Sequence, residues 1–116
     1  MPRDQGLEEL IKSALANTRG LSEKPMFGGW AYLLHGNLLC AARRGGLLLR
    51  VGKDNEAWAT QIPGVSTMIM RGRRMSGWVR ATPEAYGNDA TRQQLIDAAL
   101  RFTGSLPKKT AGKVSK

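Results

Sequence analysis

Few side chains of this chain could take part in covalent or metal chemistry. The sequence contains one His, His35, and one Cys, Cys40. Nucleophilic catalysis needs a base beside the nucleophile, and a zinc site needs more soft ligands than these two residues supply. His35 precedes Gly36 in a predicted turn, and Cys40 stands among Leu and Ala residues like a small buried hydrophobe. We therefore expect no catalytic residue, no metal site and no cofactor, and we expect that the chain is not an enzyme.

The segment from Gly46 to Lys53 superficially matches a phosphate-binding loop, which has four residues between its glycines and a Ser or Thr after its Lys. Here five residues separate Gly46 from Gly52, and Asp54 stands where the magnesium-binding hydroxyl should be. The segment also lies within a strand pattern, whereas a phosphate loop precedes a helix. We therefore reject a phosphate loop, and no small-molecule substrate is evident from the sequence.

The spacing of apolar residues and turn residues predicts one domain. With 116 residues, 41% of them hydrophobic, the chain can bury one real core. Helical periodicity predicts helices over residues 4–19, 54–60 and 88–104, the last capped by Asn88 or Asp89. Apolar runs between Gly-rich turns predict strands over residues 26–34, 38–42, 47–51, 65–70 and 75–81. The order α-β-β-β-α-β-β-α indicates the α+β class, an antiparallel five-stranded sheet with helices packed on it.

Alternation along the predicted strands divides their side chains between two faces. One face is small and aliphatic, which suits packing against helices. The other is expected to gather a candidate partner face of Trp30, Tyr32, Arg50, Trp78 and Arg80. Aromatic residues with Arg are enriched in protein interfaces and in platforms for single-stranded nucleic acid. Three interpretations stay open: a protein interface that includes self-association, a nucleic-acid surface, or a face covered by the tail, a helix or the Arg stems.

Two glycines, Gly28 and Gly29, stand inside the first predicted strand. Glycine within a strand indicates a bulge or the close approach of another backbone. A bulge there would reverse which face each later residue of the strand occupies. The position of Trp30 on the partner face therefore depends on how these glycines are accommodated.

The formal net charge of +9 has two sources in the chain. Residues 41–80 carry eight basic and two acidic side chains, and residues 106–116 carry four Lys and no acid. Because the second segment has almost nothing to bury, we expect a domain over residues 1–105 and a basic disordered tail over 106–116. The tail either increases solubility or binds nucleic acid through the charge of its phosphates.

Basic side chains can bind nucleic acid by neutralising phosphates. The candidate nucleic-acid contacts are Arg43, Arg44, Arg71, Arg73, Arg74, Lys108, Lys109, Lys113 and Lys116. The arginines lie in two predicted turns, and they form one patch if both turns fall at the same end of the sheet.

No export signal or membrane span is visible in the sequence. The first apolar stretch is interrupted by Glu8, Glu9 and Lys12, whereas a signal peptide needs an uninterrupted apolar centre. No run approaches the roughly 18 apolar residues of a membrane span. With one thiol and no such signal, we expect a cytoplasmic protein without membrane contact.

Four sequence blocks resemble the N-terminal domain family of the TfoX and Sxy proteins. They are Lys24–Gly29 (Lys-Pro-Met-Phe-Gly-Gly), His35–Asn37, Leu47–Val51 and Met75–Val79, the last followed by Thr82 and Pro83. The resemblance covers roughly residues 5–104 and implies an antiparallel sheet with helices, of the kind called secretion-chaperone-like. Founding members regulate natural competence with the cyclic-AMP receptor protein and carry a second, helical domain after this one. We expect this chain to be a stand-alone N-terminal domain.

The residues and the resemblance together predict a regulatory domain that works by binding. Its expected partner is another protein or a second copy in a homodimer, and the resemblance implies a place in transcriptional regulation. The alternative is direct binding of nucleic acid through the Arg-rich turns and the Lys-rich tail.

Overall fold

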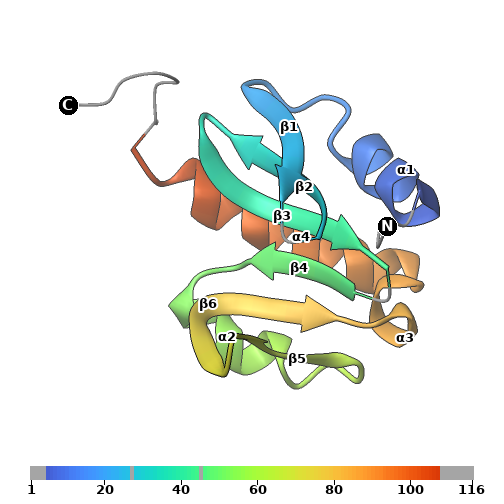
Figure 1. Ribbon diagram of the computed structural model, residues 1–116, viewed down its shortest axis with the longest axis vertical. Coiled ribbons are helices and arrows are strands. Elements are labelled where there is room, and N and C mark those ends of the chain that lie inside the picture. The colour runs from blue at the N-terminus through green and yellow to red at the C-terminus, as the bar shows by residue number, and fades with distance from the viewer. Residues whose placement is uncertain (1–4, 27, 45, 108–116) are drawn as a thin grey trace.

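Six strands form one antiparallel sheet in the order β1-β2-β3-β4-β6-β5 (Figure 1). The computed structural model describes residues 5–26, 28–44 and 46–107. The strands are β1 (Leu21–Met26), β2 (Gly29–Leu34), β3 (Asn37–Arg43), β4 (Gly46–Arg50), β5 (Val65–Met70) and β6 (Arg73–Ala81). The helices are α1 (Gln5–Ala14), α2 (Lys53–Ala59), α3 (Pro83–Tyr86) and α4 (Asp89–Gly104). None of these helices combines the length and the apolar character needed to cross a membrane.

The predicted α+β class is confirmed, but the sheet has six strands and not five. The strand that the sequence did not reveal is β1, an edge strand with four of its six residues exposed. Such a strand has no apolar run to mark it, and it tolerates Pro25 because one side of its ladder is unpaired. Met26, predicted to begin a strand, ends β1 instead.

The helix predictions need two further corrections. The first helix ends at Ala14, five residues before the predicted end, and α3 was not predicted. Pro83 lies at the first turn of α3, where its missing N–H costs nothing. The predicted cap of α4 is confirmed, because Asn88 Oδ1 accepts a hydrogen bond from the Thr91 N–H at 2.9 Å.

Two of the hairpins turn through a pair of residues with positive φ. His35 and Gly36 have φ of 51° and 83°, and Arg71 and Gly72 have φ of 53° and 76°. Positive φ at both positions is what the tight two-residue hairpin turn requires, and glycine adopts it without strain. The prediction that His35 lies in a hairpin turn is therefore confirmed.

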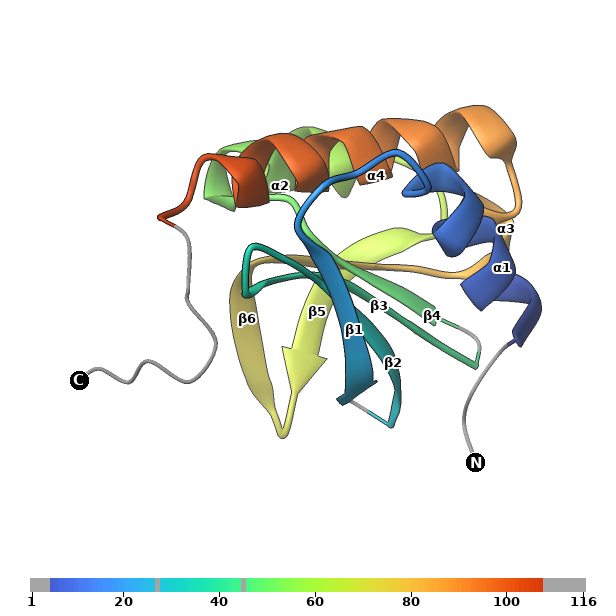
Figure 2. The same ribbon diagram turned by 90° about the horizontal axis from the view of Figure 1, so that it is seen from above.

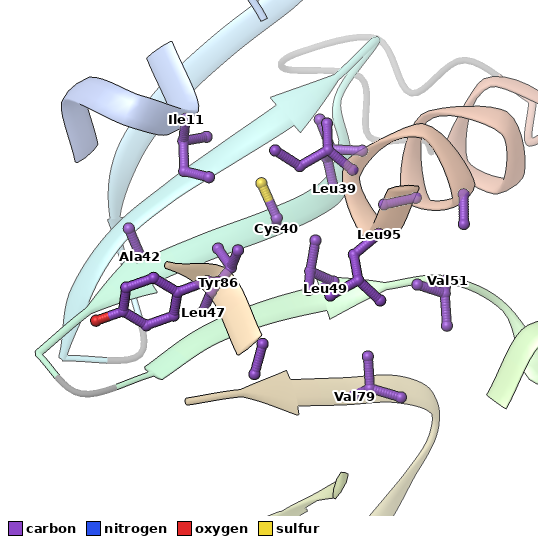
Figure 3. Close-up of a cluster of buried hydrophobic side chains, with 14 of the residues drawn as sticks. Ile11, Leu39, Cys40, Ala42, Leu47, Leu49, Val51, Val79, Tyr86 and Leu95 are labelled. Carbon is purple, nitrogen blue, oxygen red and sulfur yellow. The ribbon is translucent and has the colours of Figure 1, made fainter. Parts of the chain in front are cut away.

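The larger core lies between the sheet and the helices, all of which cover one face (Figure 2). Ile11 of α1 and Leu95 of α4 pack there against strand residues that include Leu39, Leu47 and Leu49 (Figure 3). We call this side of the sheet the helix face. It holds most of the buried apolar side chains and carries the stability of the domain.

A second cluster lies on the opposite side of the sheet, and all of its members come from strands. We call it the methionine face: Ala31, Ala41, Leu48, Met68 and Trp78 are buried, with Met26, Leu38, Met70 and Met75 partly buried around them. Figure 2 shows the outer hairpins β1–β2 and β5–β6 extending away from the helix layer. The methionine face therefore lies between these hairpins, on the side that none of the described helices covers.

Candidate functional site

The predicted partner face is divided between the two sides of the sheet. Tyr32 is on the helix face, 1% exposed, and its hydroxyl lies 3.4 Å from the backbone oxygen of Glu8. Trp30 also packs against the larger core, and its Nε1 donates to Glu23 Oε1 at 2.7 Å. Trp78 belongs to the methionine face. The expectation that all three aromatic residues share one face is therefore wrong.

The sheet register explains this division. Residues that pair directly across an antiparallel ladder point to the same face. Arg80 pairs with Leu48, and Leu48 pairs with Ala41. Ala41 in turn pairs with Ala31 of β2. It is therefore Ala31, and not its neighbour Trp30, that shares a face with Arg80.

The methionine face carries positive charge and no strand carboxylate. Arg50 pairs with Trp78 in the ladder, and Arg43 follows Ala41 by two residues, so both point to this side with Arg80. The six strands contain a single acidic residue, Glu23. Because Glu23 pairs with Tyr32, it belongs to the helix face. The methionine face is thus an apolar surface accompanied by three arginines.

The two Arg-rich turns lie at opposite ends of the sheet. Arg43 and Arg44 are at the β3–β4 turn, whereas Arg71, Arg73 and Arg74 are at the β5–β6 turn. The start of β4 pairs with the end of β6, and in Figure 1 β4 begins at the right of the view and β6 at the left. The length of β6, nine residues that span at most about 26 Å when extended, separates the two turns. The two turns therefore do not form the single nucleic-acid patch that the prediction required.

The remaining candidate nucleic-acid contacts, Lys108, Lys109, Lys113 and Lys116, lie outside the described residues. The described chain ends at Pro107, whose backbone oxygen accepts a hydrogen bond from Asn37 Nδ2 at 2.9 Å. Contacts with the sheet thus continue past residue 105, where the domain was predicted to end. At the β5–β6 turn, Arg74 forms an ion pair with Glu56 at 3.2 Å.

A pocket of about 930 Å³ opens where the end of β4 meets β6, α2 and the last turns of α4. No motif in the sequence marks this pocket. Six of its lining side chains are aromatic or cationic: Arg50, Lys53, Trp58, Trp78, Arg101 and Phe102. They are scattered over half of the chain, and only the fold brings them together. The one local feature of the sequence that points to this region is Gly77, because a glycine inside a strand pattern indicates a bulge or a close approach of another group.

Two backbone features shape this pocket. Gly77 has φ of 86°, and its carbonyl accepts hydrogen bonds from the N–H groups of both Val51 and Gly52 at 3.0 Å. This bulge in β6 holds the chain that leaves β4 and enters α2. On α2, Asn55 Nδ2 donates to the Val51 carbonyl at 2.8 Å, and Trp58 Nε1 donates to Asn55 Oδ1 at 2.6 Å. The Trp58 indole is therefore fixed in the pocket wall.

Cys40 lies in the larger core at 1% exposure, in agreement with its interpretation as a small buried hydrophobe (Figure 3). Burial raises the pKa of its thiol to about 12 from the ordinary value of 9.0, because a buried thiolate has no water around it. Since the thiolate is the nucleophile, this thiol is unreactive in the folded chain at neutral pH.

Labelling with a thiol-specific chromogenic disulfide should test this property. At pH 8 the folded protein should react at least about a hundredfold more slowly than the same protein in denaturant, because unfolding exposes Cys40 and returns its pKa to about 9. Raising the pH from 7 to 8 should accelerate labelling of both forms by about tenfold, because both pKa values lie above this range, so the difference between the two forms should persist. Fast stoichiometric labelling of the native protein would contradict the buried position of Cys40.

The family model of the TfoX N-terminal domain matches residues 13–103 of the chain. This range runs from the end of α1 to the last turn of α4 and includes all six described strands. Comparison with curated proteins and comparison with solved structures give no match. The family match also contains the four sequence blocks on which the resemblance was based. The chain therefore belongs to the TfoX N-terminal domain family.

Proposed function

We propose that this domain acts without catalysis, by binding another protein through its methionine face, in the regulation of transcription. The observation that supports this most is an apolar face built by strands alone and accompanied by three arginines. The partner we expect is a protein segment that combines apolar side chains with net negative charge. Membership of the TfoX N-terminal domain family supports the regulatory context.

The apolar side chains of this face suit a protein partner. Met26, Met70 and Met75 are only partly buried, and unbranched thioether side chains adapt to irregular partner surfaces. Accessible apolar side chains gathered on one face are typical of an interaction site, and here the partly buried members of the cluster supply them over a buried floor. Trp78 lies in its floor at 6% exposure, too covered to stack on nucleic-acid bases. The face therefore favours a protein over single-stranded nucleic acid.

The charge of the face favours an acidic partner over a second copy of the chain. A symmetric dimer places the same patch of both copies in contact, so the positive charges of Arg43, Arg50 and Arg80 from both copies would lie in one interface. Like charges brought together in an interface cost free energy, whereas Asp and Glu of a partner would be attracted. A heterologous acidic segment therefore fits this face better than a homodimer does.

Site-specific photo-crosslinking in cells should test the proposal. A photoreactive amino acid at Met75, on the methionine face, should capture one defined protein, and mass spectrometry should locate the crosslink in an acidic segment. Ile69 is the matched control position, because it is 66% exposed on neighbouring β5 and is absent from the methionine face. Position 69 should capture nothing specific.

A charge reversal then separates the proposed partner from the alternatives. Arg43→Glu should weaken binding of the captured protein by about tenfold or more, and the effect should shrink at high salt. Crosslinks to nucleic acid, crosslinks to a second copy of the chain, or equal capture from positions 75 and 69 would contradict the proposal.

A further inference from the structure

The pocket between β4, β6, α2 and α4 offers a second kind of site, beyond the proposed protein contact. Its volume of about 930 Å³ lies in the range of small-molecule sites. Its wall comes from four elements that pack on one another, so the pocket is part of the folded domain. Arg50 and Trp78 connect it to the methionine face.

Three aromatic rings line the pocket, and two of them are positioned by contacts that the structure gives. The hydrogen bond to Asn55 fixes Trp58 near the end of α2. The Phe102 ring on α4 carries the Arg50 guanidinium above it, 5.6 Å from the ring centroid. Aromatic walls held in this way accept a flat ring by stacking.

The charge of the pocket favours an anion. Arg50, Lys53 and Arg101 contribute three positive charges, whereas Asp54 is the one carboxylate in the lining. Among the residues that the structure describes, none of the three cations forms an ion pair with a carboxylate. The guanidinium of Arg50 contacts the Leu38 carbonyl at 3.4 Å, a long distance for a hydrogen bond. These cations are therefore available to an anionic ligand.

We propose that this pocket binds a small planar anion of the mononucleotide class. Its ring would stack against Trp58 and beside Phe102, over the covered Trp78 indole in the floor, and its phosphate would face Lys53 and Arg101. Both cations line the pocket, Lys53 from α2 and Arg101 from α4, and both residues are exposed. Ser76 and Gln94 also line the pocket and could hydrogen-bond to the edge of a ring. The site is built from side chains of separate elements, so it differs from the phosphate loop that the sequence excludes.

Titration monitored by the indole N–H signals in a ¹H–¹⁵N NMR spectrum should test the site. The chain has three Trp residues, of which Trp58 and Trp78 line the pocket. Trp30 lies elsewhere, hydrogen-bonded to Glu23, and serves as an internal control. Adenosine monophosphate should shift the signals of Trp58 and Trp78 and leave that of Trp30 unchanged. Neutral adenosine and inorganic phosphate should each bind about tenfold more weakly, because each lacks one of the two contacts.

Two matched substitutions of exposed arginines complete the test. Arg101→Gln, in the pocket, should weaken binding of adenosine monophosphate by about tenfold, the value of a charge-assisted hydrogen bond. Arg44→Gln, in the β3–β4 turn at the other end of β4, removes the same charge from an exposed arginine and should leave the affinity unchanged. An unaltered Trp30 signal in both variants would show that the fold is intact.

Three results would overturn the proposal of a mononucleotide site. The first is no shift of Trp58 and Trp78 at millimolar mononucleotide. The second is equal weakening by both substitutions or equal binding of phosphate alone, either of which would indicate diffuse charge. The third is a far higher affinity for a single-stranded oligonucleotide, which would assign the pocket to nucleic acid.

Discussion

Replacing Leu49 by alanine should lower the free energy of unfolding by about 2–5 kcal/mol. Leu49 is 0% exposed and pairs with Cys40 on one side and with Val79 on the other, at the centre of the larger core (Figure 3). Truncation removes buried methyl groups and leaves a cavity that the flanking strands can only partly fill. Since small domains are stable by about 5–15 kcal/mol, this single change should cost a large part of the total.

Urea unfolding followed by circular dichroism measures this effect. Ile69→Ala is the control, because the Ile69 side chain is 66% exposed and its truncation should change the unfolding free energy by no more than about 0.5 kcal/mol. If Leu49→Ala were as stable as Ile69→Ala, the larger core would not lie between β4 and the helices as described.

Replacing Gly29 by alanine should also destabilise the domain strongly, by about 3 kcal/mol. A Cβ at this position would overlap the backbone oxygen of Ala42 and lie 2.6 Å from the Arg43 Cβ. Backbone cannot move aside as a flexible side chain does, so β2 and β3 would have to separate. This confirms the expected close backbone approach at the glycine pair and gives a physical reason for the second glycine of the Met-Phe-Gly-Gly block.

Gly72→Ala provides the matched control for the steric effect. A Cβ at Gly72 would meet no atom within 4 Å, but its φ of +76° is unfavourable for alanine. This variant should therefore lose only about 1 kcal/mol, the cost of the backbone conformation. Equal losses in the two variants, measured by urea unfolding, would show that steric overlap at Gly29 is not the cause.

Local features of the chain were well predicted from the sequence. The His35-Gly36 and Arg71-Gly72 turns, the cap at Asn88 and the burial of Cys40 each depend on a few neighbouring residues, and the structure has all of them. The α+β class and the family follow from the same kind of local pattern. The missed strand β1 fits this rule, because an exposed edge strand has no apolar pattern to detect.

Features that depend on pairing between strands could not be predicted in the same way. Alternation within β2 correctly separated Trp30 from Ala31, yet it could not tell which of the two lies on the side of Arg80. A strand can be joined to its neighbour with either face up, and only the register decides which. The sequence likewise left open whether the two Arg-rich turns share one end of the sheet, and the strand pairing places them at opposite ends.

The sequence by itself determined where the chain turns after β2, β3 and β5, which residues are apolar enough to be buried and that the basic charge is concentrated in two segments. The tertiary structure alone decided which side chains meet: the arginines beside the methionine face, and the cations and aromatic rings around the pocket. The physical reason is the distance along the chain between the residues that interact. Turn and helix preferences are set by neighbours along the chain, whereas Arg50, Trp78 and Phe102 come together only through the strand ladder and the packing of α4 on the sheet.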